Sequence, residues 1–181
     1  FVRRHAPRIR TGGLGSVVRM TAVLACPHCG DALERTDSGA ACAAGHSFDR
    51  AREGYLNLLP GGRLPASTVA GDTAEALAAR RRFLSTDAYA TVADAVASAL
   101  GDVDGALLDI GCGEGWYLAR MDAPSRFGID ISKKAVQMAA RSLPDADFVV
   151  ASSRRMPVLD GSCAAVMSVF APHPFDEIAR V

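Results

Sequence analysis

The sequence lacks a long hydrophobic run and has no excess of charge of either sign. No apolar stretch approaches the ~18 residues that a membrane-spanning helix needs, so a membrane span is ruled out. The chain has 20 basic and 20 acidic residues, so its net charge is zero, which excludes a uniformly basic nucleic-acid coat but not a local basic patch. With 49% hydrophobic and 22% charged residues over 181 positions, it has the composition of a folded globular protein.

Cysteine is scarce and odd in number, with five residues at positions 26, 29, 42, 112 and 163. No hydrophobic segment typical of a signal peptide precedes them. An odd number of thiols without a secretion signal argues against a secreted disulfide framework. We therefore predict a reducing, cytoplasmic environment, in which three of the thiols bind a metal ion.

Composition and chain-breaking residues divide the sequence into four segments. Residues 1–19 contain five arginines, no acidic residue and a glycine-rich run, which predicts a disordered extension. Residues 20–62 form a compact unit of short strands, and residues 63–72 form a linker that follows the breaker Pro-Gly-Gly. Residues 73–181 then supply the larger domain.

The larger domain begins with two helical patterns and continues with alternating strands and helices. We predict helices over 74–84, 89–100, 116–121 and 133–143 and strands over 106–110, 127–130, 148–151 and 164–170. Alternation of short apolar strands with helices is typical of a parallel α/β sheet. The fold class predicted is therefore α/β, with a Rossmann-like parallel sheet.

A metal site is predicted in the N-terminal unit. Four ligands follow the spacing C-x2-C, twelve residues, C-x3-H: Cys26, Cys29, Cys42 and His46. Cysteine and histidine in such pairs suit a tetrahedral Zn²⁺, and four protein ligands leave no open position, so the zinc is structural. A unit of ~40 residues cannot bury a sufficient core alone, so a metal would also stabilise it. His28, between the first two cysteines, is not counted as a ligand.

A glycine-rich loop is the second motif with chemical meaning. Gly111, Gly113 and Gly115 follow a predicted strand and precede a helix, where glycines let a ligand approach the backbone closely. The spacing G-x-G-x-G departs from the G-x-G-x-x-G of dinucleotide-binding proteins. Asp109 precedes the first glycine, and a carboxylate suits the cationic S-adenosyl-L-methionine better than a pyrophosphate. Asp130, at the end of the next strand, can bind both ribose hydroxyls.

These motifs together resemble a known family, the bacterial 23S rRNA (guanine-N1)-methyltransferases, from about residue 24 to residue 181. The glycine loop is common to many methyltransferases, whereas the zinc unit joined to the segment at 53–60 is far more specific. The matching pieces are Cys-Pro-x-Cys at 26–29, Cys42 with Gly-His-Ser-Phe-Asp at 45–49, Glu-Gly-Tyr-Leu-Asn-Leu-Leu-Pro at 53–60, Gly-Asp at 71–72, Ala-Arg-Arg-Arg-Phe-Leu at 79–84, Leu-Asp-Ile-Gly-Cys-Gly-Glu-Gly at 108–115 and Ala-Ser-Ser at 151–153.

The resemblance implies a zinc-ribbon-like domain that helps to grip rRNA and a class I domain that methylates guanine N1 in a hairpin loop of 23S rRNA. One branch of the family confers macrolide resistance and the other is housekeeping, and the sequence does not choose between them. The chain could form a homodimer, and no membrane partner is expected. By the same resemblance, the residues close to the cofactor include Tyr89, Glu114, Gly115, Ala151 and Ser152. Tyr89 also suits an ordinary core position.

The segment after the fourth predicted strand is where such methyltransferases meet their substrate. Phe170 could stack on the guanine, and His173 or Asp176 could accept the proton that N1 must lose. Asp176 also suits a plain helix cap. The three arginines at 80–82 lie on different faces of one helix, so they suit either phosphate contacts or a solvated surface.

Two other functions stay open at this point. One is a methyltransferase for a small molecule or a protein, with the zinc unit as a docking module, and a requirement for rRNA would separate it from the first hypothesis. The other is a non-catalytic fragment that binds zinc and RNA. The sequence supplies about four strands, fewer than the class I fold uses, so we expect a fragment with an incomplete sheet, an open edge and one exposed apolar face.

Overall fold

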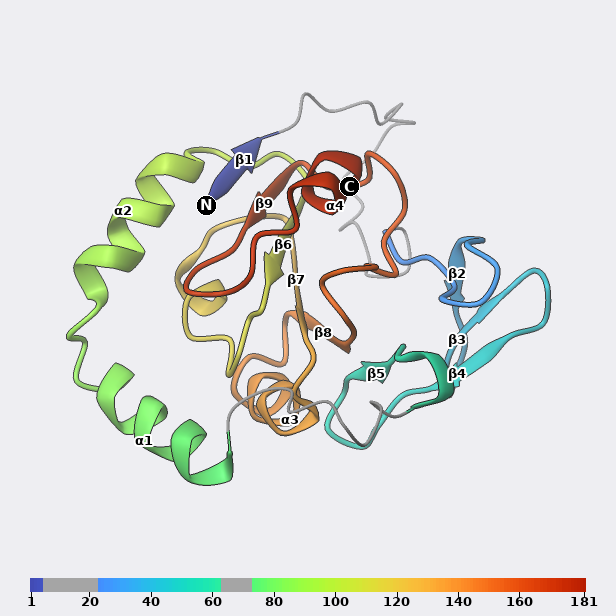
Figure 1. Ribbon diagram of the computed structural model, residues 1–181, viewed down its shortest axis with the longest axis horizontal. Helices are drawn as coiled ribbons and strands as arrows, with labels where there is room; N and C mark the ends of the chain where they lie inside the picture. Colours follow the sequence, from blue (N-terminus) through green and yellow to red (C-terminus); the bar gives the residue numbers. More distant parts are fainter. Residues whose placement is uncertain (5–22, 63–72) are drawn as a thin grey trace.

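The computed structural model describes residues 1–4, 23–62 and 73–181, and its main feature is a six-stranded sheet (Figure 1). The strands lie in the order β1-β9-β6-β7-β8-β5, and all neighbouring pairs are parallel except β1 with β9. The four central strands are β6 (Ala106–Ile110), β7 (Ser125–Asp130), β8 (Asp147–Val150) and β9 (Ala165–Met167). The predicted α/β fold with a Rossmann-like parallel sheet is confirmed.

In the described part of the chain, four α-helices accompany the strands, and two of them begin at residues whose side chains cap the first turn. They are α1 (Ala74–Leu84), α2 (Ala90–Leu100), α3 (Lys133–Ser142) and α4 (Phe175–Arg180). The side chains of Thr73 and Ser132 accept hydrogen bonds from backbone N–H groups in the first turns of α1 and α3. The helix predicted over 116–121 is only a 3-10 turn, η3 (Leu118–Arg120), because the chain must extend at Met121 to enter β7.

Both edge strands of the sheet come from segments that were not predicted to belong to the larger domain. The strand β1 (Val2–Arg4) pairs with β9, so the prediction of a disordered extension over 1–19 is wrong for these residues. The physical reason is that β9 has unpaired backbone groups on its outer side, and β1 satisfies them. On the opposite edge, β5 (Leu56–Asn57) pairs with β8. Residues 5–22 and the predicted linker 63–72 lie outside the described residues.

The zinc unit is a three-stranded antiparallel sheet that packs on the main sheet. Its strands are β2 (Leu33–Arg35), β3 (Gly39–Cys42) and β4 (Ser47–Asp49). Leu24 forms a β-bridge with Val158, and Leu24 and Leu33 are buried in one cluster with Ile129 of β7. The segment predicted as a separate domain over 20–62 therefore shares its core with the larger domain.

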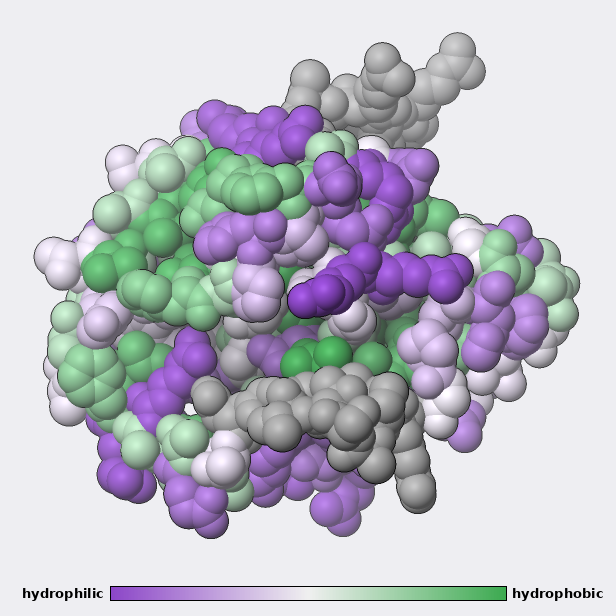
Figure 2. All heavy atoms as spheres, in the orientation of Figure 1, coloured by the Kyte–Doolittle hydropathy of each residue, from purple (hydrophilic) through white to green (hydrophobic). Residues whose placement is uncertain are grey.

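Opposite faces of the main sheet are covered by different elements, because successive strand residues point to opposite sides. Leu108 packs toward the zinc unit and Ile178 of α4, whereas Leu107 packs toward α2 and α3. Within the described part of the chain both faces of the sheet are therefore covered, in contrast to the expected exposed apolar face, and the outer side of β9 is paired with β1. On the face in Figure 2, hydrophobic side chains gather at the upper left over α2 and hydrophilic ones at the lower left over α1. No described helix has the length and apolar character needed to cross a membrane.

Candidate functional site

Four metal-ligating atoms meet at one end of the zinc unit. The Sγ atom of Cys42 lies 3.3 Å from Nδ1 of His46 and 3.6 Å from Sγ of Cys29. The Sγ atom of Cys26 lies 3.6 Å from the same Nδ1, and all four ligand atoms lie within 4.8 Å of one another. Ligands bound to zinc at about 2.0–2.3 Å in a tetrahedron have this spacing, so the donor set and the geometry fit Zn²⁺.

His28 is close to these ligands without belonging to them. Its ring stacks on Phe48 with 5.9 Å between ring centroids and a 12° angle between ring planes. The group of potential metal ligands among the described residues does not include it. His28 also contacts the ligand His46, with 5.0 Å between ring centroids, without belonging to the ligand group.

The glycine loop begins where β6 ends and turns through three glycines with left-handed backbones, Gly111, Gly113 and Gly115. Gly111 has φ +70° and Gly113 has φ +56°, a region that side chains disfavour. A Cβ atom on Gly111 would lie 2.4 Å from Cβ of Ala171, so only glycine fits there. The N–H groups of Gly111 and Cys112 both donate to the carbonyl of Ile129, which holds the loop against β7.

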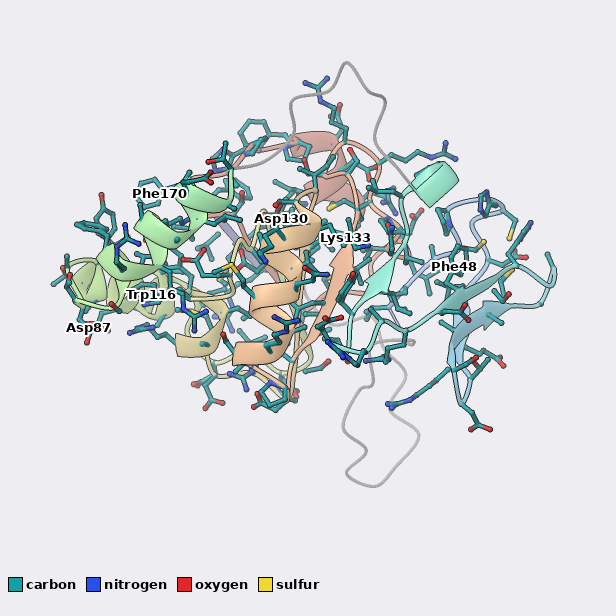
Figure 3. All side chains as sticks on the ribbon, turned by 90° about the horizontal axis from the view of Figure 1, so that it is seen from below. Phe48, Asp87, Trp116, Asp130, Lys133 and Phe170 are labelled. Carbon is teal, nitrogen blue, oxygen red and sulfur yellow. The ribbon has the colours of Figure 1, made fainter. Side chains whose placement is uncertain are left out.

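Asp130 ties the glycine loop to the start of α3. Its Oδ2 accepts a hydrogen bond from the N–H of Gly113 at 2.9 Å, and its Oδ1 accepts one from the N–H of Ser132 at 2.7 Å. Figure 3 shows Asp130 at the start of α3, between Phe170 on one side and Phe48 of the zinc unit on the other. The carboxylate thus has a fixed orientation at the carboxyl end of β7, where ligands of open α/β sheets bind.

Asp109 lies beneath the same loop and is 2% exposed. Burial and the neighbouring carboxylate of Asp130 raise the pKa of Asp109 to about 7, although the charge of Arg80 acts in the opposite direction. A buried acid beside a second acid favours a cationic neighbour, because a cation would stabilise its ionised form.

A pocket of about 490 Å³ opens over the glycine loop. The predicted cofactor residues that line it are Gly111, Gly113, Asp130, Ala151 and Ser152. The other predicted cofactor residues do not line it: Glu114 and Gly115 line a separate hollow of about 250 Å³, Tyr89 contacts Phe170, and Asp109 is buried. A larger pocket of about 690 Å³ lies where Cys26 and Leu58 meet Met156 and Arg180, but neither the glycine loop nor Asp130 lines it. We therefore identify the 490 Å³ pocket as the candidate cofactor site.

Aromatic side chains stand at the mouth of this pocket. Phe170 lines the pocket, is 70% exposed and has a left-handed backbone conformation with φ +54°. Its ring meets that of Tyr89 edge-to-face at 5.6 Å, and Phe83 contacts Tyr89 in turn at 5.3 Å. The left-handed residue ends the fourth central strand earlier than the predicted 164–170, because it bends the chain after Ser168.

The two predicted proton acceptors lie on a neighbouring groove and not in the pocket itself. His173 and Asp176 are exposed and line a groove that shares Arg154 and Pro172 with the pocket. The ring of His173 stacks against Phe175 with centroids 6.2 Å apart. Their distance from a bound substrate depends on how the substrate enters, so their role stays a prediction.

Sequence reasoning missed two residues that shape the site. A Cβ on Gly128 would lie 2.8 Å from Cys112, so this glycine lets the loop lie close to β7. Tyr117 is 4% exposed, and its ring lies 6.3 Å from that of Phe170. Gly128 lies inside a strand pattern, where a glycine signals close backbone approach, but no local pattern identifies Tyr117.

Comparisons with known proteins agree with this two-part architecture. Residues 24–63 match the family model of the RlmA N-terminal zinc ribbon, and residues 107–181 match a methyltransferase domain. The zinc ribbon contains the Cys/His cluster, and the methyltransferase domain contains the glycine loop. The pair supports S-adenosyl-L-methionine and a structural Zn²⁺ as the cofactors.

Three curated relatives are named as established or putative 23S rRNA (guanine-N1)-methyltransferases. The chain is 39% identical over 169 residues to a 23S rRNA (guanine(748)-N(1))-methyltransferase of Streptomyces fradiae, a match that covers 87% of this chain and 59% of the relative. It is 40% identical over 87% of its length to a putative 23S rRNA (guanine-N(1)-)-methyltransferase of Micromonospora griseorubida, of which it covers 61%. A putative enzyme of the same name from Bacillus subtilis is 30% identical, with coverages of 86% and 59%. The chain thus spans about three fifths of the length of these relatives.

Proposed function

We propose that this chain takes part in methylating N1 of a guanine in 23S rRNA. It is a relative of the 23S rRNA (guanine-N1)-methyltransferases and combines an RlmA-type zinc ribbon with a methyltransferase domain. The observation that carries the proposal is the juxtaposition of Asp130 and the glycine loop with the exposed ring of Phe170 at one pocket. The pocket supports a nucleoside cofactor, and the ring supports an unstacked base beside it.

The residues of the pocket fit S-adenosyl-L-methionine. Asp130 would bind the ribose hydroxyls, the glycines at 111 and 113 would let the cofactor lie against the backbone, and Asp109 would favour its positive charge. When bound, this cofactor supplies a methyl group on a sulfonium, which leaves as a neutral thioether. The task of the protein is then mainly to hold the base in line with that methyl group.

Phe170 is the residue that would position the base. An aromatic ring that is 70% exposed at a pocket mouth gains about 1–3 kcal/mol when a nucleobase stacks on it. Its left-handed backbone is a strained conformation for a non-glycine residue, and such conformations cluster at functional sites. His173 and Asp176, on the adjoining groove, would accept the proton of N1 directly or through water.

We expect 23S rRNA as the macromolecular partner and the bacterial cytoplasm as the site of action. A role in macrolide resistance and a homodimer stay predictions. Arg50, which donates to the carbonyl of Gly54 at 2.7 Å, and the exposed Arg52 lie on the zinc unit and would contact phosphates.

The experiment is primer extension on 23S rRNA after incubation with the chain and S-adenosyl-L-methionine. Methylation at N1 blocks the Watson–Crick edge, so reverse transcriptase stops at the modified guanine. We expect one new stop in a hairpin loop, which is lost in Phe170→Ala and retained in the matched variant Phe170→Tyr, which keeps an aromatic ring at this exposed position. The absence of a stop with a chain that binds S-adenosylhomocysteine would contradict the proposal for this chain.

A further inference from the structure

Two of the four exposed phenylalanines among the described residues lie on neighbouring hollows of the surface. Phe170, which is 70% exposed, lines the candidate cofactor pocket, and Phe175, which is 62% exposed, lines the adjoining groove of about 430 Å³. The proposed function gives a role to Phe170 but none to Phe175. Exposed apolar side chains that gather beside a site mark a surface that another molecule covers.

The ring of Phe175 belongs to a small aromatic platform. The ring of His173 stacks against it, with centroids 6.2 Å apart and a 19° angle between the ring planes. Phe1 meets both rings edge-to-face, 5.9 Å from His173 and 5.5 Å from Phe175. Pro172 and Pro174 flank His173 and restrict its backbone. The rings are therefore held in place before a ligand binds, which lowers the entropy that binding costs.

The groove and the cofactor pocket share one wall. Ser153, Arg154 and Pro172 line both hollows. The N–H of Arg154 donates to Oγ of Ser152 at 3.2 Å, which holds the backbone of this wall, while the side chain of Arg154 is exposed. A cation thus stands between two exposed aromatic surfaces. Sites for single-stranded nucleic acids have this composition, with basic groups for the phosphates and rings for the bases.

The acidic residues of the groove agree with a base as its occupant. The carboxylate of Glu177 accepts hydrogen bonds from the N–H of Met156 at 2.7 Å and from Arg180 at 2.8 Å, so the protein itself satisfies it. Asp176 is exposed and offers acceptor oxygens to the groove. A carboxylate there would repel an acidic peptide, but it can accept a hydrogen bond from the amino group of a nucleobase.

We propose that Phe175, with the stacked ring of His173 and the cation of Arg154, binds the nucleotide next to the methylated guanine, with the base on the rings and the phosphate at Arg154. This second stacking site rests on the proposed function for the identity of the guanine at Phe170. Phe175 is then a positioning residue, which helps to decide which guanine reaches the pocket. Stacking uses the face of the His173 ring, so it is compatible with proton acceptance by a nitrogen at the ring edge.

The test measures how much the neighbouring base contributes to RNA binding. The probes are the fluorescently labelled pentaribonucleotide U-A-G-A-U and two versions of it, each with one adenine replaced by an abasic residue. Fluorescence anisotropy follows their binding to the full chain at saturating S-adenosylhomocysteine. The wild type should bind one of the two abasic RNAs about 5–150-fold more weakly than the intact RNA, because a base that stacks on an aromatic side chain contributes this much to affinity.

Variants of Phe175 assign this preference to its ring. In Phe175→Leu, which keeps an apolar side chain, the intact and abasic RNAs should bind within about twofold of each other. The matched variant Phe175→Tyr keeps the ring and should keep the wild-type preference. Arg154→Gln should retain the preference for the base but lower the slope of log affinity against log salt concentration by about 0.7, the value for one phosphate contact on a single strand.

Several outcomes would overturn the proposal. Equal wild-type affinity for the three RNAs, or binding of none of them, would exclude the second stacking site, and neither result needs a variant. A Phe175→Leu variant that loses affinity for all three RNAs equally would show a merely structural role. Primer extension on 23S rRNA separates the two proposals. A new stop without a base preference would contradict only the second stacking site, whereas a base preference without a stop would support that site and contradict the proposed methylation.

Discussion

The carboxylate of Asp130, at the end of β7, accepts a hydrogen bond from the backbone N–H of Gly113 at 2.9 Å. The two residues come from different strand–loop units and are 17 positions apart. Through this bond the acidic residue that would bind the ribose also holds the loop that would lie along the cofactor. One side chain therefore supports both the shape and the chemistry of the candidate pocket.

Replacing Asp130 by asparagine should weaken the binding of S-adenosylhomocysteine at least about tenfold. Asparagine has only one acceptor oxygen, so it cannot serve both Gly113 and Ser132 and a ribose hydroxyl as well. Calorimetric titration of the ligand checks this expectation. The exposed Asp122→Asn is the control and should bind like the wild type, and equal affinity in the two variants would argue against a role for Asp130.

The stability of the chain should depend on pH through Asp109. Its pKa is raised to about 7 in the folded chain, chiefly by burial, against about 4 in an unfolded chain. Between these values the folded state binds more protons than the unfolded state, so the free energy of unfolding falls as the pH rises. Asp109→Asn removes this dependence.

The measurement for Asp109 is urea denaturation of the wild type and the asparagine variant at pH 5 and pH 8. The variant should gain stability relative to the wild type by on the order of 2 kcal/mol between these two conditions. Asp122→Asn should show no such change with pH. A difference between Asp109→Asn and the wild type that stays constant from pH 5 to pH 8 would show that Asp109 does not titrate in this range.

A matched pair of glycine substitutions separates steric fit from backbone strain. Gly111 (φ +70°) and Gly161 (φ +60°) both have left-handed backbones. A Cβ on Gly111 would lie 2.4 Å from Ala171, whereas a Cβ on Gly161 would meet nothing within 4 Å. Gly161→Ala should therefore cost about 1 kcal/mol, and Gly111→Ala about 1–3 kcal/mol more. Denaturant titration measures both, and equal losses would contradict the close fit.

Loss of the zinc ligands should destabilise the main sheet as well as the zinc unit. Leu24 and Leu33 share a buried cluster with strands β6 and β7, so the core of the larger domain depends on how the ligands hold this unit. We expect Cys29→Ser to lower the metal content measured by mass spectrometry and to reduce the free energy of unfolding by at least about 2 kcal/mol. The control His28→Ala should retain one zinc ion per chain. Full zinc content in Cys29→Ser would exclude Cys29 as a ligand.

The proposed proton acceptors are tested by separating turnover from binding. His173→Ala together with Asp176→Ala should slow methyl transfer to 23S rRNA about 100-fold and leave the affinity for S-adenosylhomocysteine within about threefold of the wild type. Rates are measured by transfer of a radioactive methyl group at saturating cofactor. Unchanged turnover in the double variant would remove both residues from the mechanism.

Features that depend on short stretches of chain could be predicted from the sequence alone. The spacing of Cys26, Cys29, Cys42 and His46 predicted the ligand cluster, because two pairs of ligands at fixed separations can meet around one ion. The apolar run that ends at Ile110 and the glycines after it predicted a strand and a ligand-binding turn, because both are local backbone preferences. The positions of the helices that begin at Ala74 and Lys133 followed from local helical patterns in the sequence.

Which distant segments meet became known only from the three-dimensional fold. The pairing of β1 with β9 and of β5 with β8 joins residues more than 90 positions apart, and no periodicity in either segment specifies its partner. The sequence likewise does not distinguish Arg80 from the two arginines that follow it. Only the position of α1 shows that Arg80 lies over Gly113. These arrangements depend on the sum of many weak contacts in a shared core, and such a sum cannot be read from any one segment.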